Sequence, residues 1–309
     1  MPRHTENLQK APHMRRRLFF AALVLLGGTA FWVITAPTHL PASATATLTS
    51  DAAAGEPVFW AAGCASCHMA PQAEGEAKLI LAGGQRFPSP FGTFLAPNIS
   101  TDPTHGIGGW SLETFANAVT RGISPAGSHY FPVFPYTAYT KMTLQDLANL
   151  KAYMDTLPPS TATNLPHEVA FPFNIRRNLG GWKWLFDSPD WAMNTDLTAQ
   201  QTRGRYLAEA LAHCAECHTP RGALGGLDRN KWLAGAPDPS SKGRIPNITP
   251  AALDWSEADI TAYLTTGFTP EYDSAGGHMV PVVENMARLP LADVQAIAAY
   301  LKRVPPIAD

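Results

Sequence analysis

The residues best suited to chemistry are the only four cysteines, which fall in two pentapeptides, Cys64-Ala-Ser-Cys67-His68 and Cys214-Ala-Glu-Cys217-His218. On one helical turn, positions i, i+3 and i+4 share a face. Both thiols of a pentapeptide can then bond to the vinyl groups of a haem while the histidine reaches its iron, which is the attachment chemistry of c-type haem. The sequence therefore predicts two covalent haem c groups, held by the four cysteines, with His68 and His218 as iron ligands.

Other uses of two Cys-x-x-Cys pairs explain less. Two disulfides, a redox dithiol or part of a zinc site would each account for the thiols. None of them accounts for the histidine that follows both pairs, and a disulfide framework would be surprising in a chain with room for two domains.

The duplication extends beyond the cysteines. Pro97-Asn98-Ile99-Ser100 recurs as Pro246-Asn247-Ile248-Thr249, and Trp110-Ser111 recurs as Trp255-Ser256. Apolar residues at helical spacing lie between Thr143 and Pro158, and again between Pro290 and Pro305, so each copy is expected to close with an amphipathic helix. We expect one unit over residues 51–160 and a second over 201–309, both mainly α-helical and rich in loops, with the two tryptophans packed around the haems.

The N-terminal region is typical of a membrane anchor. Residues 18–36 form a run of 19 residues without a charge, which as a helix is long enough to cross a bilayer. Residues 1–17 are basic, and no lysine or arginine follows until Lys78, so we expect a cytoplasmic N-terminus and an exported remainder. Residues 37–50 would be a short tether. A cleaved signal peptide ending at Ala42-Ser43-Ala44 is the alternative.

Charge excludes one class of partner. From Leu18 onward the chain carries 18 basic and 24 acidic residues, so the globular part offers no basic face for a nucleic acid. Its 45% apolar content also excludes a disordered chain.

These motifs resemble the small class I cytochrome c fold, duplicated in tandem. The order of Pro97-Asn-Ile, Gly106-Ile-Gly-Gly-Trp-Ser, Tyr130-Phe-Pro-Val-Phe-Pro-Tyr and a final Tyr-x-x-x-Leu-Pro-Pro is similar to that in cytochrome c subunits of membrane-bound bacterial dehydrogenases. The resemblance covers both units and implies service in periplasmic alcohol, gluconate or aldehyde oxidation. The alcohol and gluconate dehydrogenase subunits usually carry three haem motifs, whereas this chain carries two.

The sixth ligand of each iron separates a carrier from a catalyst, because methionine closes the iron to substrates and raises its potential. In the second unit the resemblance favours Met279, in a glycine-containing loop, over Met286. In the first unit the related subunits often have methionine where this chain has Phe134. We therefore expect Met142 to be the ligand, with His129 as the runner-up.

Other candidates receive simpler roles. His129 and His278 occupy equivalent places and are expected to be structural. His213 is expected at the surface or near a haem propionate, and His105 in solvent. Residues 161–200 form an aromatic and basic bridge, which is expected to contain a short helix that clamps the two units together; a docking surface for the partner is the alternative.

The predicted function is that of a membrane-anchored dihaem cytochrome c and not of an enzyme. It would carry single electrons from a periplasmic dehydrogenase subunit to an oxidase or another cytochrome of the respiratory chain, at the bacterial inner membrane. The rival is a dihaem enzyme of the peroxidase or thiosulfate dehydrogenase type, with one open or bis-histidine iron.

Overall fold

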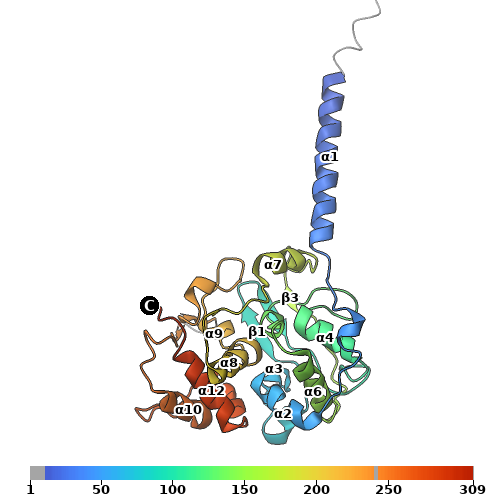
Figure 1. Cartoon of the computed structure of the whole chain (residues 1–309). Helices are drawn as coiled ribbons and strands as arrows, with labels where there is room; N and C mark the ends of the chain where they lie inside the picture. The colour runs from blue at the N-terminus through green and yellow to red at the C-terminus, as the bar shows by residue number, and fades with distance from the viewer. Residues whose placement is uncertain (1–10, 240–242, 309) are drawn as a thin grey trace, which may run out of the picture.

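The structure, a computed structural model, describes residues 11–239 and 243–308 of the chain. Part of the basic N-terminus expected over residues 1–17, including Arg3, Glu6 and Lys10, lies outside the described residues. Helices dominate the described part, as predicted. They form two neighbouring groups of short helices, from which one long helix projects (Figure 1).

The projecting helix is α1(Ala11–Ile34), which contains the predicted apolar run. Its segment His13–Ile34 spans 22 residues with a mean hydropathy of 1.9, and none of it is buried by the rest of the protein. By length and composition this helix can cross a membrane.

The segment after α1 differs from a free tether. It contains a short 3₁₀ helix, η1(Ala42–Ala44), and lies along the first unit. The Leu40 N–H donates to Asn117 Oδ1 at 2.8 Å, and Gln145 Nε2 donates to the Thr49 carbonyl at 2.6 Å. Residues 37–50 are therefore held against the first unit, an arrangement that a composition rich in Thr, Ala, Ser and Pro does not reveal.

The first unit surrounds the first pentapeptide. Its helices are α2(Ala52–Ala61), α3(Cys64–His68), η2(Gly75–Leu79), α4(Leu112–Arg121), α5(Tyr136–Tyr139) and α6(Leu144–Met154). Strands β1(Arg86–Ser89), β2(Gly92–Leu95) and β3(Glu168–Val169) add a small antiparallel sheet, in the order β1-β2-β3. The sheet is too short to leave a clear alternation of polar and apolar residues in the sequence.

The second unit repeats this order around the second pentapeptide. Its elements are α8(Ala199–Arg205), the π-helical turn η3(Tyr206–Leu211), α9(Ala215–His218), η4(Arg229–Lys231), β4(Ala236–Pro237), β5(Arg244–Ile245), α10(Glu257–Thr266), α11(Met279–Met286) and α12(Leu291–Leu301). The closing helices α6 and α12 begin and end within the predicted segments, α6 after Thr143, whose hydroxyl accepts from the Asp146 N–H.

The first and last helices of each unit cross at a glycine. At Gly55 of α2, a Cβ atom would lie 2.0 Å from the Asn149 carbonyl oxygen of α6, and at Gly204 of α8 it would lie 1.8 Å from that of Ala296 of α12. Only glycine permits so close an approach of two helix backbones. The crossing packs the first helix of each unit, which precedes the haem motif, against the last helix of that unit.

Replacing Gly204 by alanine should destabilise the second unit, because the added methyl group would force α8 and α12 apart. We expect a loss of about 3 kcal/mol in the free energy of unfolding, measured by chemical denaturation. Gly222→Ala is the matched control, since its Cβ would have no neighbour closer than 4.0 Å. Equal stabilities of the two variants would contradict this account of the crossing.

The units meet along an interface that joins α3 and η2 to α11. Asn285 Nδ2 donates to Ser66 Oγ at 2.9 Å, and Lys78 forms an ion pair with Glu284 at 2.6 Å. At a second point the Tyr206 hydroxyl donates to Asp146 Oδ2 at 2.5 Å. The interface therefore holds the two haem motifs in a fixed relation.

The bridge contains the short helix that the sequence indicated, α7(Asn178–Phe186). Lys183 Nζ donates to the Gly122 carbonyl of the first unit at 3.0 Å. Trp182 Nε1 donates to the Leu224 carbonyl of the second unit at 2.8 Å. Because α7 contacts both units, it connects them from the side on which α1 emerges (Figure 1).

Candidate haem-attachment sites

Each pentapeptide folds as a single helical turn. The first forms α3, and the second begins one residue before α9. The spacing of three residues therefore brings the two thiols of each pair to one side of a turn. All four thiols are free of disulfides, so they remain available for thioether bonds.

The imidazoles that follow the cysteines are oriented in the same way in both units. His68 Nδ1 lies 2.8 Å from the Pro97 carbonyl oxygen, and His218 Nδ1 lies 2.8 Å from that of Pro246. A carbonyl only accepts, so Nδ1 carries the proton and the lone pair is on Nε2. In the described part of the chain neither Nε2 makes a hydrogen bond. This unprotonated Nε2 is the atom that an iron ligand requires, and the hydrogen bond at Nδ1 fixes the tautomer.

Burial supports the same protonation state. It lowers the pKa of His68 and of His218, and the hydrogen bond to the proline carbonyl opposes this shift in both. Both imidazoles are therefore neutral at physiological pH, as metal ligation requires.

A glycine holds each loop close to its histidine. The Gly83 N–H donates to the His68 carbonyl at 2.7 Å, and the Gly235 N–H donates to that of His218 at 2.7 Å. Gly83 has a φ of +74°, and a Cβ there would lie 2.5 Å from the Pro97 carbonyl carbon. A side chain at this position would displace the carbonyl that orients the histidine.

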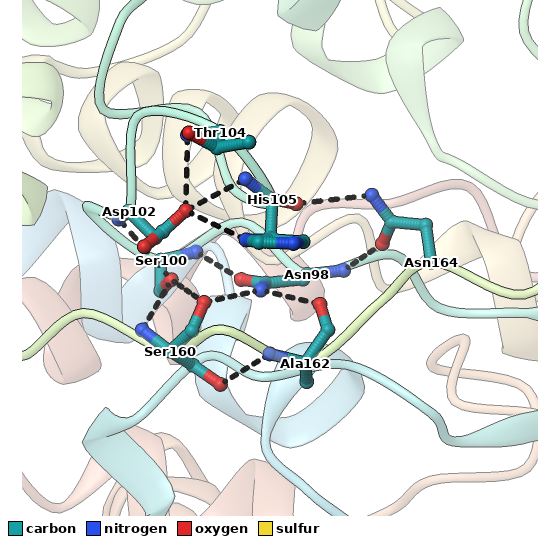
Figure 2. A network of polar contacts seen from close by, with 8 residues as sticks. All are labelled: Asn98, Ser100, Asp102, Thr104, His105, Ser160, Ala162 and Asn164. Carbon is teal, nitrogen blue, oxygen red and sulfur yellow. Dashed lines mark hydrogen bonds and ion pairs between the residues drawn. The ribbon is translucent and has the colours of Figure 1, made fainter.

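The asparagine of the Pro-Asn-Ile motif also holds the loop in place. Figure 2 shows the Asn98 side chain within a network of polar contacts. Its Nδ2 donates to the carbonyls of Ser160 at 2.7 Å and Ala162 at 2.9 Å, and its Oδ1 accepts from the Ser100 N–H at 2.9 Å. In the second unit Asn247 Nδ2 donates to the Ile307 carbonyl at 2.8 Å. The asparagine thus ties the loop beneath each histidine to the segment after the closing helix.

We expect Asn98→Ala to destabilise the first unit by about 2 kcal/mol, because two partly buried carbonyls and the buried Ser100 N–H would lose their partner. Denaturant unfolding of the holoprotein measures this loss. Asn247→Ala is the matched change in the second unit and should cost a similar amount. An unchanged unfolding midpoint in both variants would show that the network does not hold the loops.

The thiols do not have the environment of a redox dithiol. Burial raises the pKa of Cys64 and that of Cys214 to about 12. Reactive Cys-x-x-Cys pairs have lowered pKa values instead. In residues 11–239 and 243–308, no three His, Cys, Asp or Glu side chains gather as a site for a bare metal ion. The donor set of paired neutral thiols and one oriented imidazole fits covalent haem.

The two candidate methionines occupy different positions in their units, and the expectation that Met279 lies in a loop is wrong. Met142 is buried and lies directly before α6, whereas Met279 is half-buried and is the first residue of α11. Tyr130 and Ala275 are equivalent positions, since their N–H groups donate to the Gly122 and Gly267 carbonyls. Four residues after each lie Phe134 and Met279, which therefore correspond. Counted back from the closing helices, Met142 corresponds to Leu289, so the second loop is two residues longer. Each unit therefore offers a methionine before its last helix, at its own position.

The structure assigns His129 to the end of α1. Its Nε2 lies 2.9 Å from the carbonyl oxygen of Thr35, to which it donates, while its Nδ1 is buried without a partner. Ligation through Nε2 would break this hydrogen bond, so the structural role expected for His129 fits this position better than ligation. The equivalence expected between His129 and His278 is not observed. In hairpin register His129 corresponds to Ser274, and His278 is the exposed N-cap residue of α11.

His213 lies between the units and not on their outer surface, whereas the role near a haem propionate stays a prediction. Its ring packs against Tyr139 of the first unit, with ring centroids 5.7 Å apart, and burial lowers its pKa. His213 therefore belongs to the interface between the units. His105, by contrast, is partly exposed and pairs with Asp102 at 3.2 Å. Trp110 and Trp255 pack against the core.

The sequence predicted the cysteines and histidines but not the two proline carbonyls that orient the imidazoles. The repeated Pro-Asn-Ile motif indicated that these prolines matter, but not how. They orient the histidines through contacts between residues 29 positions apart in one unit and 28 in the other.

Comparison with known proteins decides the family. The family model for cytochrome c matches this chain twice, at residues 52–158 and 201–305. The chain belongs to the cytochrome c family. Each match contains one pentapeptide with its oriented histidine. The protein is therefore a dihaem cytochrome whose cofactors are two haem c groups.

Relatives of this cytochrome include a dihaem c-type cytochrome of Cereibacter sphaeroides, 56% identical over 295 residues, which cover 95% of this chain and 100% of that protein. The fructose dehydrogenase cytochrome subunit of Gluconobacter japonicus is 38% identical over 81% of this chain and 51% of that subunit. The gluconate 2-dehydrogenase cytochrome c subunit of Pantoea cypripedii is 33% identical over 80% of this chain and 58% of that subunit. The cytochrome thus spans somewhat more than half the length of these two subunits and is related to electron-transfer components of dehydrogenases.

Proposed function

We propose that this cytochrome is anchored in the bacterial inner membrane by α1. It accepts single electrons from a periplasmic dehydrogenase and passes them to an oxidase or another cytochrome of the respiratory chain. When bound, haem c supplies a one-electron couple. The observation that carries the proposal is the duplicated geometry of Cys-x-x-Cys-His, in which the lone pair on Nε2 of both histidines is available to bind iron.

We assign the residues as follows. Cys64 and Cys67 hold one haem and Cys214 and Cys217 the other. His68 and His218 are the proximal ligands. Met142 and Met279 are the sixth ligands, because each lies before the closing helix of its unit, Met142 in a loop and Met279 at the start of α11, and packs against the core. A thioether from each loop would close both irons to substrates, as a carrier requires.

Contact between the two attachment motifs supports exchange of electrons within the protein. The Tyr139 ring of the first unit lies 5.7 Å from that of His213, directly before the second motif, and Thr137 Oγ1 donates to Glu216 Oε1 within that motif at 3.3 Å. The Cys217 thiol also helps to raise the pKa of Cys67. The haem-bearing turns of both units therefore approach each other at the interface. Their separation is fixed by the contacts between α3 and α11 and by α7.

The membrane assignment rests on α1 and on charge. Arg15, Arg16 and Arg17 stand at the N-terminal end of the apolar helix, and the next basic residue is Lys78. This asymmetry favours a cytoplasmic N-terminus and haem units on the opposite side of the membrane. The relatives named as dehydrogenase cytochrome subunits support a dehydrogenase as the donor.

The proposal is tested in membranes that contain the cytochrome and a dehydrogenase encoded beside it. Addition of that enzyme's substrate should reduce the c-type haems, and oxygen should reoxidise them. Membranes that carry a variant without the four cysteines are the control. A high-spin, peroxide-reactive iron in the unmodified ferric protein would instead support the dihaem enzyme and overturn the carrier.

A further inference from the structure

An apolar patch lies on the outside of the globular part, on α7 and on the turn that leads into it. It consists of Phe171, Phe173, Ile175, Trp184 and Leu185. Phe171 is 77% exposed, Trp184 73% and Leu185 57%. A single exposed apolar residue needs no explanation, but five within fifteen residues, two of them on adjacent positions of one helix, mark a surface with a partner. We call this surface the α7 patch.

The helix α7 has two faces with different neighbours. Trp182, Lys183 and Phe186 point to the globular units: the first two donate to carbonyls there, and the ring of Phe186 covers Gly226. Gly180 and Gly181 point to α1 instead, since a Cβ on Gly180 would lie 2.3 Å from the Thr35 carbonyl oxygen.

The exposed residues lie on the α1 side. Trp184 and Leu185 follow Gly180 and Gly181 by four positions, and residues four apart on a helix share a face. The two large apolar side chains therefore project on the side of α7 that meets the end of α1, one turn further along.

The end of α1 is fixed to this region. Arg177, directly before α7, donates to the Trp32 carbonyl and to Thr35 Oγ1 at 2.9 Å, and its guanidinium lies 4.1 Å from the centre of the Trp32 ring. Thr35 is 1% exposed. Figure 1 shows α7 at the end of the globular part from which α1 projects. A helix that leaves the bilayer at Ile34 would thus place α7 at the level of the lipid headgroups.

The charge of the segment suits that level. Residues 170–186 contain Arg176, Arg177 and Lys183 and no acidic residue. Exposed tryptophan and apolar side chains without an acidic neighbour suit the membrane interface, where tryptophan is enriched.

We propose that the α7 patch is a second membrane contact, which rests on the outer surface of the bilayer beside α1. The inference depends on the proposed anchor, because it is the exit of α1 that brings α7 to the lipid. Trp184 and Leu185 enter the interfacial region, while Arg176, Arg177 and Lys183 point inward and donate to carbonyls of the protein.

The test uses the full-length holoprotein, in which the four native cysteines are consumed as thioethers and an introduced thiol is the only one that reacts. Trp184→Cys and Leu185→Cys place a thiol in the patch at exposed positions that the fold does not need. Ala258→Cys is the control, on an exposed position of α10 at the end of the globular part away from α1 (Figure 1). Each variant is placed in nanodiscs of phosphatidylcholine and phosphatidylglycerol and treated with a charged, membrane-impermeant maleimide.

We expect the thiols at positions 184 and 185 to react about tenfold more slowly than the thiol at 258, after each rate is divided by that of the unfolded variant, because lipid excludes the reagent and disfavours the thiolate. Equal rates in protein that floats with lipid on a density gradient would overturn the α7 contact while leaving the anchor intact, and would assign the patch to a protein partner. Protein that does not float with lipid would overturn both proposals. The two failures are therefore distinguishable.

Discussion

The double variant Cys64→Ala/Cys67→Ala should carry one covalent haem instead of two. Without both thiols the first pentapeptide has no thioether bond to form, while the second pentapeptide keeps its own pair and its own oriented histidine. The mass of the intact protein should fall by one haem, and the haem-to-protein ratio should halve. Denaturing gels stained for haem should still show a band, because the remaining haem is covalent.

The reciprocal variant, Cys214→Ala/Cys217→Ala, is the matched control and should also retain one haem. The thiol lost in each case comes from an equivalent helical turn, so a difference in the number of haems between the two variants would be unexpected. Retention of two covalent haems by either variant would contradict the assignment of the thioether residues.

The second large effect concerns the sixth ligands. Met142→Ala and Met279→Ala should each remove the methionine–iron charge-transfer absorption of one ferric haem and lower the reduction potential of that haem. Because axial ligands set haem potentials over about 0.8 V, a fall on the order of 0.1 V is expected for the altered haem. Absorption, electron paramagnetic resonance and a spectroscopic redox titration measure the change, and only one of the two haems should be affected in each variant.

Core methionines provide the controls. Met154 and Met286 are buried like Met142, at 4%, 3% and 5% exposure, but they lie within the apolar cores of α6 and α11. Met154→Ala and Met286→Ala should cost about 2–5 kcal/mol of stability and leave both ferric spectra unchanged. If Met286→Ala abolished the charge-transfer absorption and Met279→Ala did not, the ligand of the second unit would be reassigned.

Local patterns carried most of what the sequence could predict. The two pentapeptides, the closing helices after Thr143 and Pro290, and the long apolar helix each depend on residues within a few turns of one another, so spacing alone is informative. The mainly helical fold and the two haem groups followed from these patterns and from the resemblance that they carry.

Contacts between residues far apart in the chain could not be predicted from spacing. The place of His213 depends on Tyr139, 74 positions earlier in the numbering, and that of His129 depends on Thr35, 94 positions away. Composition indicated a loose tether over residues 37–50, but amide side chains at Asn117 and Gln145 hold it in place. Such partners become visible only when the packing of the units is known.

The joint between α1 and the globular part has a mechanical consequence. His129, Arg177 and Gly180 all contact Thr35, so no flexible hinge separates the apolar helix from the haem units. A cytochrome on a hinge could swing between a donor and an acceptor at different heights. This one would keep a constant orientation and height above a membrane, so its redox partners must reach it by lateral diffusion or by standing permanently beside it.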